Sequence, residues 1–375
     1  MSRPAIAAPL QRGRPPRVRK RYVVLAIVVV VLAVPVYSYV STMLQPSSLP
    51  LGVRSIEWLR LHHGAWIVNE VERVYYNAHA PKKGGPTLRT LPKVGAEPLP
   101  AARAYAPARI APVITPALRG EGTWSRSGPL VRGHAPVLVT AYRAQADYPR
   151  VVAYVAWLDH TRTRLSLVPG RYEPPSSLPR GPMEVPQSLR THLLATFNSG
   201  FTYHDGHGGF YADGRSYTPL QRGYATLVGY HDGNVDVKTW TSGPAPGRDV
   251  LFARQNLPLL VDAGRPSAAL QSGRDWGATL GNAVRVWRSG VGVDRKGNLV
   301  YAAADYQTAQ SLAAILIHAG AVRAMELDIN SEWPTFITYA KRGARDPVRL
   351  VPNTQQPLTR YLVPDDRDFF AVYSA

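Results

Sequence analysis

The stretch that decides the fold runs from Val284 to Asn298 and reads Val-Arg-Val-Trp-Arg-Ser-Gly-Val-Gly-Val-Asp-Arg-Lys-Gly-Asn. Its β-branched residues predict a strand over Val284–Val293, and the Asp-Arg-Lys-Gly-Asn sequence predicts a turn into a second strand over Asn298–Ala304. Apolar residues three and four positions apart then predict a helix over Gln307–Ala319. A strand, a turn, a strand and a helix in this order favour a sheet covered by one helix.

Further strands are predicted on both sides of this stretch, because short apolar runs alternate there with turn residues. The runs are Val137–Arg143, Val151–Asp159, Arg164–Val168, Leu193–Phe197, Ala225–Tyr230, Asn234–Trp240, Leu257–Val261 and Val322–Leu327. No repeat of about 20 to 50 residues is visible, which argues against a solenoid or a propeller. The predicted fold class is α+β, with a mixed or antiparallel sheet domain and few helices.

The composition of the 375-residue chain excludes several kinds of chemistry. The chain has no cysteine, which excludes disulfides, thiolate zinc sites, iron–sulfur ligation and a cysteine nucleophile. Charged residues make up 18% of the chain, so it is not a charge-rich disordered protein. Its site must therefore use carboxylates, amides, arginine or histidine.

The net charge of +19 is concentrated in part at the N-terminus, where residues 1–21 contain seven basic residues and no acidic one. Residues 22–40 follow without a charge, and 19 helical residues span roughly the 30 Å hydrocarbon core of a bilayer. Basic residues before such a segment orient it with its N-terminus in the cytoplasm. The sequence predicts a single-pass signal anchor in the cell membrane, with the C-terminal domain on the extracytoplasmic side.

A cleaved signal peptide is the alternative interpretation of this segment. Its apolar region has about 7 to 15 residues and ends at a small-residue cleavage site. Here the run is longer and continues into Tyr37-Ser-Tyr-Val-Ser-Thr-Met43, which is a poor cleavage sequence. We therefore favour an anchor that is not cleaved.

The remaining excess of 12 positive charges is spread over the rest of the chain. No block of Lys and Arg with interleaved aromatic residues occurs there, so the sequence does not predict nucleic-acid binding. The predicted partners are the membrane and an anionic envelope glycan or glycopolymer, and the alternative is an ordinary arginine-rich solvated surface.

The chain is predicted to have five parts. A basic cytoplasmic tail (1–21) and the anchor (22–40) precede a membrane-proximal helical segment (41–79), a proline-rich linker (80–121) and the main domain (122–375). In the third part, Ser55 is a candidate N-cap for a helix that continues to about Asn77, with apolar residues at Ile56, Leu59, Ile67, Val71, Val74 and Tyr75. The linker contains eight prolines, which favours an extended spacer or an irregular strap packed on the domain.

Polar residues gather first where a predicted strand ends at Asn198 and continues into Ser-Gly-Phe-Thr-Tyr-His-Asp-Gly-His. Gly200 allows a ligand to approach the backbone closely, and Asn198 supplies a donor and an acceptor. His204, Asp205 and His207 could hold a divalent cation, but a zinc site needs three or four ligands and a polar loop is the simpler interpretation. The prediction is accordingly that the protein has no cofactor.

Arg288 and Ser289 form the second group of polar residues, within the apolar strand predicted over Val284–Val293. A buried guanidinium needs a partner, because burying an unpaired charge is costly. The partner is either a phosphate or carboxylate of a ligand or an internal acidic residue. The sequence leaves both alternatives open.

The third place follows the predicted helix, where Glu326, Asp328 and Asn330 share one face if the backbone is extended. Two carboxylates and an amide suit acid–base catalysis or binding of sugar hydroxyls. The Asp-x-Asn-x-Glu pattern also resembles calcium ligands, although the glycine and the twelve-residue length of an EF-hand loop are missing.

These three segments, in this order, resemble the phosphodiester glycosidase family. Asn198-Ser-Gly-Phe201 is similar to the family's Asn-Gly-Gly-Phe-like loop, and Leu257-Pro-Leu-Leu-Val-Asp-Ala-Gly264 to a strand ahead of a glycine turn. Arg288-Ser-Gly-Val-Gly-Val-Asp294 resembles an Arg-Thr-x-x-Gly-x-Asp strand, and Leu327-Asp-Ile-Asn-Ser331 the Leu-Asp-Gly-Gly-Gly-Ser motif. The resemblance covers about Gly122 to Ala375.

The resemblance implies an α+β hydrolase that acts on a sugar joined through phosphate at its anomeric carbon. It implies that Arg288 holds the phosphate while Asn198 and Asp328 shape the sugar pocket. Asp328 and Glu326 are then the candidate catalytic residues, and Asn198, Arg288, Asn330, Ser289 and Gly200 the candidate substrate-binding residues.

The sequence departs from the family pattern at the site itself. The glycine-rich turn after Asp328 is replaced by Ile329, Asn330 and Ser331, and the family's threonine by Ser289. Larger residues narrow the space for a ligand. Two alternatives to a hydrolase therefore stay open. The first is a non-catalytic glycan-binding or envelope-assembly protein in which Trp333 and Tyr339 stack on sugar rings, and the second is a metal-dependent enzyme built on His204, Asp205, His207 and Asp328.

Overall fold

The computed structural model describes residues 20–95, 97–98, 105–271, 276, 285–352 and 356–375. The chain divides into two compact units, Met1–Gln45 and Pro46–Ala375. The first unit contains helix α1 (Lys20–Leu44), which among the described residues is the one helix long and apolar enough to cross a membrane. A signal sequence near an N-terminus has the same character.

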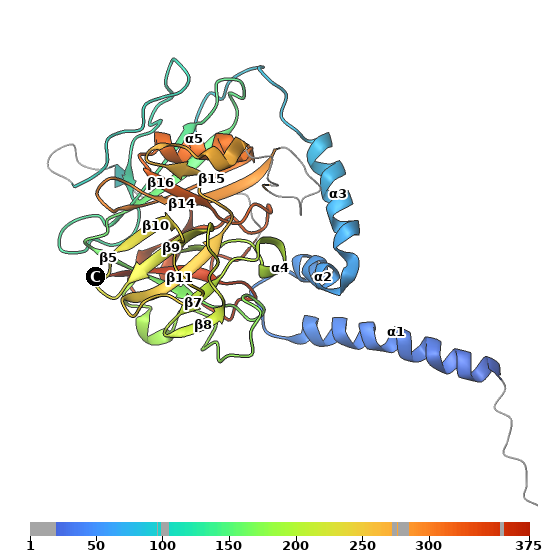
Figure 1. The fold of residues 1–375 in the computed structure, drawn as a ribbon. Helices are drawn as coiled ribbons and strands as arrows, with labels where there is room; N and C mark the ends of the chain where they lie inside the picture. Colours follow the sequence, from blue (N-terminus) through green and yellow to red (C-terminus); the bar gives the residue numbers. More distant parts are fainter. Residues whose placement is uncertain (1–19, 96, 99–104, 272–275, 277–284, 353–355) are drawn as a thin grey trace, which may run out of the picture. The chain divides into compact units, whose positions relative to one another are not determined.

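The second unit is built on three antiparallel sheets in its described part (Figure 1). The largest has nine strands in the spatial order β1 (Glu97–Pro98), β2 (Ser125–Arg126), β3 (Val137–Arg143), β4 (Val152–Leu158), β15 (Leu299–Gln307), β14 (Val286–Val293), β16 (Arg323–Glu326), β12 (Val261–Asp262) and β13 (Arg265–Pro266).

Two five-stranded sheets complete this scaffold. One has the order β10 (Val235–Thr239), β9 (Ala225–Tyr230), β11 (Val250–Asn256), β7 (Phe210–Ala212) and β8 (Arg215–Thr218). The other has the order β18 (Arg345–Arg349), β17 (Phe336–Lys341), β6 (Leu193–Asn198), β19 (Phe369–Ser374) and β5 (Thr163–Val168). The short helical turns are η2 (Gln187–Leu189), α4 (Tyr203–Gly206) and η3 (Ala268–Gln271).

The predicted α+β class with few helices is confirmed, and each strand pair of the described residues is antiparallel. The strand predicted over Leu257–Val261 is wrong. Only Val261 of that run belongs to a strand, since the ladder of β11 ends at Asn256 and Pro258 follows. The sequence analysis missed β11 because Arg254, Gln255 and Asn256 are polar, although all three are buried.

Helix α5 (Ala309–His318) covers one face of the large sheet (Figure 1). Its Leu312 and Leu316 are fully buried, and glycines of β14 face it. A Cβ atom at Gly290 would lie 2.9 Å from Leu316 Cδ1 and 3.0 Å from the Met325 carbonyl oxygen. Glycine therefore lets the helix lie close to β14, while Val291 points to the opposite core.

The membrane-proximal segment contains two helices where the sequence predicts one. Helix α2 (Leu51–Leu59) and helix α3 (Ala65–Ala78) are joined by η1 (Arg60–Gly64), in which His63 has φ 66°. The predicted N-cap Ser55 lies inside α2, where its hydroxyl donates to the Leu51 carbonyl. The chain turns at this point because His62 and His63 leave the helical conformation.

The described part of the proline-rich segment packs on the sheet domain. Ile110 is 3% exposed, and its N–H donates to the Gly122 carbonyl. The Trp124 indole donates to the Ala108 carbonyl at 2.9 Å. The Gly84 N–H donates to the Asp147 carbonyl. The boundaries proposed for the five parts of the chain remain predictions.

Replacing Leu312 by alanine should destabilise the second unit by about 2–5 kcal/mol, because a cavity would form between α5 and the strands β14 and β15. We expect the midpoint of urea unfolding of the full chain in detergent to fall accordingly. Gln310→Ala, at an exposed position of the same helix, is the matched control; it removes one hydrogen bond to the Leu270 carbonyl and should cost no more than about 1 kcal/mol. Equal midpoints for the two variants would contradict the packing described for α5.

Candidate active site

A pocket of about 420 Å³ lies where the loops after β6 and β16 meet the segment just before β19. Helix α2, the turn η1 and helix α3 form its remaining wall. Each wall contributes charged side chains, among them Glu57, Arg60, Asp205, Asp328 and Arg367.

The centre of this pocket is an ion pair between Asp328 and Arg367. Arg367 Nη2 donates to Asp328 Oδ2 at 2.6 Å and to the Gly200 carbonyl at 3.2 Å. The other carboxylate oxygen of Asp328 accepts from the Asn330 N–H at 3.1 Å. The Arg367 guanidinium also lies over the Trp333 ring, 4.5 Å from its centroid. Both charged groups are therefore fixed by several contacts.

The helical wall adds a second set of charges. Glu57 Oε2 lies 3.8 Å from Arg367 Nη1, which is beyond hydrogen-bond distance. Arg60 Nη2 donates to Glu72 Oε2 at 2.6 Å, and Glu72 Oε1 accepts from Asn330 Nδ2 at 3.3 Å. The wall is thus connected by hydrogen bonds to the loop that contains Asp328.

Burial raises the pKa of three carboxyl groups around Arg367. The pKa of Asp328 is raised by desolvation, and the charge of Arg367 offsets part of this rise. Desolvation also raises the pKa of Glu57, against the charges of Arg367 and Arg60. Glu173, whose Oε2 accepts from the Tyr203 N–H, has its pKa raised by burial to about 7. Carboxyl groups with raised pKa values can hold a proton at a higher pH than exposed ones.

A polar network beneath the pocket positions the backbone of Asp328. Asn198 Nδ2 donates to Ser289 Oγ at 3.0 Å, and Ser289 Oγ donates to the Asp328 carbonyl at 2.7 Å. Asn198 Oδ1 accepts from the Tyr301 hydroxyl and from the Thr335 N–H, each at 2.9 Å. The predicted residues Asn198 and Ser289 are thus brought together with Asp328, although neither lines the pocket.

Arg288 and Glu326 pair with each other outside the pocket lining. Arg288 Nη1 donates to Glu326 Oε1 at 2.6 Å, and further donors reach the carbonyls of Gln307 and Trp276. Arg288 is 4% exposed and Glu326 is fully buried. The geometry matches the internal ion pair, one of the two alternatives that the sequence left open.

The predicted common face of Glu326, Asp328 and Asn330 does not form. Strand β16 ends at Glu326, so the backbone is no longer an extended strand when it reaches Asp328. Asp328 and Asn330 line the pocket, whereas Glu326 lies in the interior. Gly200 lies against Asn256, because a Cβ atom there would be 3.3 Å from the Asn256 side chain.

Residues 191–328 match the family model described as phosphodiester glycosidase. This segment is similar to a phosphodiester glycosidase domain and spans 138 of the 375 residues. The matched segment of this domain begins before β6 and ends at Asp328, so it contains Asn198, Gly200, Arg288 and Glu326 as well. Arg367 and the helical wall lie outside it.

Comparison with solved structures finds three proteins with low sequence identity. The zebrafish N-acetylglucosamine-1-phosphodiester alpha-N-acetylglucosaminidase catalytic domain, auto-inhibited by its pro-peptide, is 14% identical, with a TM-score of 0.45, and the match covers 66% of this chain and 86% of that chain.

A hypothetical protein from Synechocystis is 11% identical, with a TM-score of 0.39, over 68% of this chain and 64% of that chain. A putative exported protein from Burkholderia pseudomallei is 12% identical, with a TM-score of 0.34, over 62% of this chain and 76% of that chain. The comparison with curated proteins finds no match.

The pocket lining contains two charged residues that the sequence analysis did not single out, Arg367 and Glu57. Arg367 belongs to the run Asp365-Asp-Arg-Asp368, directly before the apolar strand β19. Four charged residues at the start of a buried strand are a signal that could have been found. Glu57 lies on a helix that the sequence predicts, but its direction toward the pocket depends on the tertiary structure.

The metal cluster considered for His204, Asp205 and His207 does not assemble. His204 Nδ1 lies 3.4 Å from Asp205 Oδ1, and the Asp205 carboxylate accepts from the Thr202 hydroxyl. Within the described ranges, no group of three or more His, Asp or Glu side chains is arranged to hold a metal ion.

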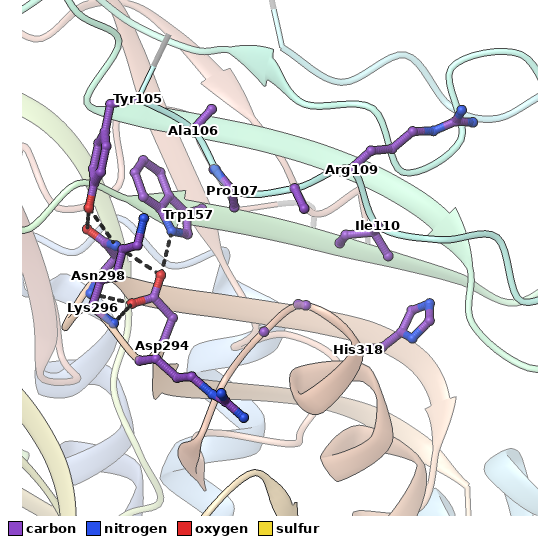
Figure 2. Close-up of a pocket in the computed structure, with 14 residues that line it drawn as sticks. Tyr105, Ala106, Pro107, Arg109, Ile110, Trp157, Asp294, Lys296, Asn298 and His318 are labelled. Atoms are coloured by element: carbon purple, nitrogen blue, oxygen red, sulfur yellow. Dashed lines mark hydrogen bonds between the residues drawn. The ribbon is translucent and has the colours of Figure 1, made fainter. Parts of the chain in front are cut away.

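A second cavity of about 400 Å³ lies at the other end of β14 (Figure 2). Asp294 there accepts from the Trp157 indole and from the Asn298 side chain. Its other oxygen accepts from the N–H groups of Lys296 and Asn298. Asp294 therefore closes the β14–β15 turn, and no predicted site residue lines this cavity.

Glu173→Gln should flatten part of the pH dependence of stability. The folded protein binds the Glu173 proton more tightly than the unfolded chain, so its contribution to the free energy of unfolding is present at low pH and is lost as the pH rises from about 4.5 to about 7. Relative to the variant, the wild type should lose about 1–3 kcal/mol over this range. Urea unfolding at several pH values measures it.

Glutamine keeps the acceptor for the Tyr203 N–H, so the variant isolates the effect of titration. Glu184→Gln, at a less buried position, is the control for neutralising a glutamate. Parallel pH profiles of the wild type and Glu173→Gln would contradict the raised pKa.

Proposed function

We propose that the chain is a membrane-anchored extracytoplasmic hydrolase that cleaves a sugar-1-phosphodiester bond in an envelope glycan or glycopolymer. The observation that carries this proposal is the Asp328–Arg367 pair in the pocket where the phosphodiester glycosidase segment ends. An arginine and a buried carboxyl group in one pocket supply the two functions that the reaction needs, namely binding of a phosphate and transfer of a proton.

Arg367 is the phosphate-binding residue in this proposal. A guanidinium donates N–H groups to phosphate oxygens. Arg367 Nη2 already donates to Asp328 and to the Gly200 carbonyl, so Nη1, which lies 3.8 Å from Glu57 Oε2, is the nitrogen proposed to meet the phosphate. Trp333 supports the guanidinium from one side. Arg288, which the family resemblance favoured for this role, donates instead to Glu326 and to backbone carbonyls.

Asp328 is the catalytic acid or base. Hydrolysis breaks the bond between the anomeric carbon and the phosphate oxygen, while water supplies a hydroxyl to the sugar and a proton to the released phosphomonoester. A carboxyl group with a raised pKa can give or take this proton. Asp205 supplies a second carboxylate to the lining of the same pocket.

Membrane attachment is supported by the length and composition of α1 and by the seven basic residues among positions 1–21. Under the positive-inside rule, the N-terminus lies in the cytoplasm and the glycosidase domain on the opposite side. Envelope glycans and glycopolymers are then the accessible substrates, and the excess of basic residues on the domain suits their negative charge.

A glycan-binding protein without catalysis is the second candidate. It is favoured by the residue after Asp328, because Ile329 is 2% exposed and packs with Tyr76 of α3 where the family pattern has glycine. Stacking of sugars on Trp333 and Tyr339 has less support. Two arginine side chains lie over the Trp333 ring, and Tyr339 is fully buried.

Asp328→Asn should lower kcat on a sugar-1-phosphodiester by about 100-fold or more, because the group that transfers the proton is removed. Arg367→Lys keeps the charge but loses the fork of donors, so KM should rise about tenfold. The full chain in detergent is incubated with the substrate, and the released free sugar is quantified.

Asp262→Asn, at an exposed position, is the matched control and should retain wild-type activity. Thermal unfolding of each variant separates loss of the fold from loss of chemistry. Retained binding of the glycan by the wild type, without any release of sugar, would exclude the hydrolase and support the second candidate.

A further inference from the structure

Most of the apolar residues that predict a helix over 55–77 are exposed instead of packed on the domain. In α3, Val71 is 64% exposed, and Val74 and Tyr75 are each 57% exposed. Ile67 and, in α2, Ile56 are exposed as well. We call the residues Ile67, Val71, Val74 and Tyr75 the outer stripe. A contiguous exposed apolar surface of this kind marks an interaction site.

The outer stripe follows the helical repeat, since its members are separated by four, three and one residues. The opposite side of α3 packs on the domain, where Val68 and Tyr76 are buried and Glu72 contacts Arg60 and Asn330. A third side is exposed and mainly polar, with Glu70, Arg73 and Asn77 beside the exposed Trp66. The same helix thus forms the pocket wall on one side and presents an apolar surface on another.

The short connection between α1 and the second unit limits what can cover the outer stripe. Helix α1 ends at Leu44, and Ser47 and Ser48 donate hydrogen bonds to the carboxylates of Asp366 and Asp365 in the glycosidase unit. Three residue steps from Leu44 to Ser47 reach at most about 11 Å. A bilayer crossed by α1 therefore has to lie close to the segment that also contains Arg367.

The aromatic and basic side chains near the stripe are of the types found in helices that lie on a membrane surface. Tyr75, a member of the stripe, is 57% exposed near the end of α3, whereas Trp66, 71% exposed at its start, lies on the side of Arg73 and Asn77. Such amphipathic aromatic side chains are enriched at membrane interfaces. Arg73, Lys82 and Lys83 are exposed in and after the helix. Arg73 is paired with Glu70, and Lys83 Nζ lies 3.7 Å from Asp147 Oδ2, so Lys82 contributes most to any attraction to anionic lipids.

We propose that the outer stripe of α3 binds the lipid surface of the membrane that α1 crosses. This inference rests on the anchoring part of the proposed function. Binding through the stripe places the other side of the same helix, with Glu72 and the pocket, next to the bilayer surface. The glycosidase domain would then take sugar phosphodiesters presented at the membrane rather than chains that diffuse far from it.

Because the chain has no cysteine, one cysteine can be introduced and labelled with an environment-sensitive nitrobenzoxadiazole dye. The full chain with Val71→Cys is reconstituted into vesicles of phosphatidylcholine and phosphatidylglycerol. We expect a blue-shifted emission, and strong quenching by lipids with a nitroxide on the acyl chain. Val74→Cys should behave in the same way, whereas Asn77→Cys on the polar side should show solvent-like emission and little quenching.

The readout does not depend on hydrolysis, so it separates this proposal from the proposed reaction. Solvent-like emission at both Val71→Cys and Val74→Cys would overturn the lipid contact. The emission could instead be blue-shifted without quenching by the lipids, with a shift that becomes smaller as the ratio of protein to lipid is lowered. That result would show that a second copy of the chain covers the stripe, and it would also overturn the lipid contact. If the labelled protein is cleaved on the C-terminal side of α1 and is then recovered free of vesicles, the membrane anchor is lost. The proposal of lipid contact, which rests on that anchor, would then fail.

Discussion

The ion pair between Asp328 and Arg367 is the interaction on which the pocket depends. Both residues are less than a tenth exposed, and a buried charge that loses its partner costs about 3–5 kcal/mol. The pair joins the loop after β16 to the segment before β19. Arg367 also donates a hydrogen bond to the Gly200 carbonyl, which joins the loop after β6 to the other two segments. Three chain segments that are distant in sequence are therefore held at one point.

The rest of the structure keeps this point in place from two sides. Below it, Asn198 and Ser289 fix the Asp328 carbonyl, and Gly290 of β14 lets α5 support the strands from behind. Above it, Arg60 and Glu72 tie the helical wall to Asn330. The wall is thus part of the site, although it lies outside the segment that matches the phosphodiester glycosidase family.

The sequence predicts those features that depend on local patterns. Alternating apolar runs located most of the strands, and the three-and-four spacing located α5 and the region of α2 and α3. The partner of Arg288 could not be predicted, because a strand pattern places an arginine in the interior without saying whether an acidic side chain or a ligand meets it. Arg367 could not be assigned either, since its partner lies 39 residues away. The outer stripe shows the same limit, as helical periodicity identifies an apolar face but not what covers it.

The charge balance of the pocket gives Glu57 a defined part in the reaction proposed above. Its carboxylate lies 3.8 Å from Arg367 Nη1, so a phosphate bound by this nitrogen would meet a second negative group there, at a cost in free energy. Burial already raises the pKa of Glu57, and an incoming phosphodiester raises it further by repulsion. Uptake of a proton then changes Glu57 from a competitor for Arg367 into a hydrogen-bond donor to the phosphate. Binding of the anion is therefore coupled to uptake of a proton by Glu57, so the affinity for the phosphodiester should increase toward acidic pH.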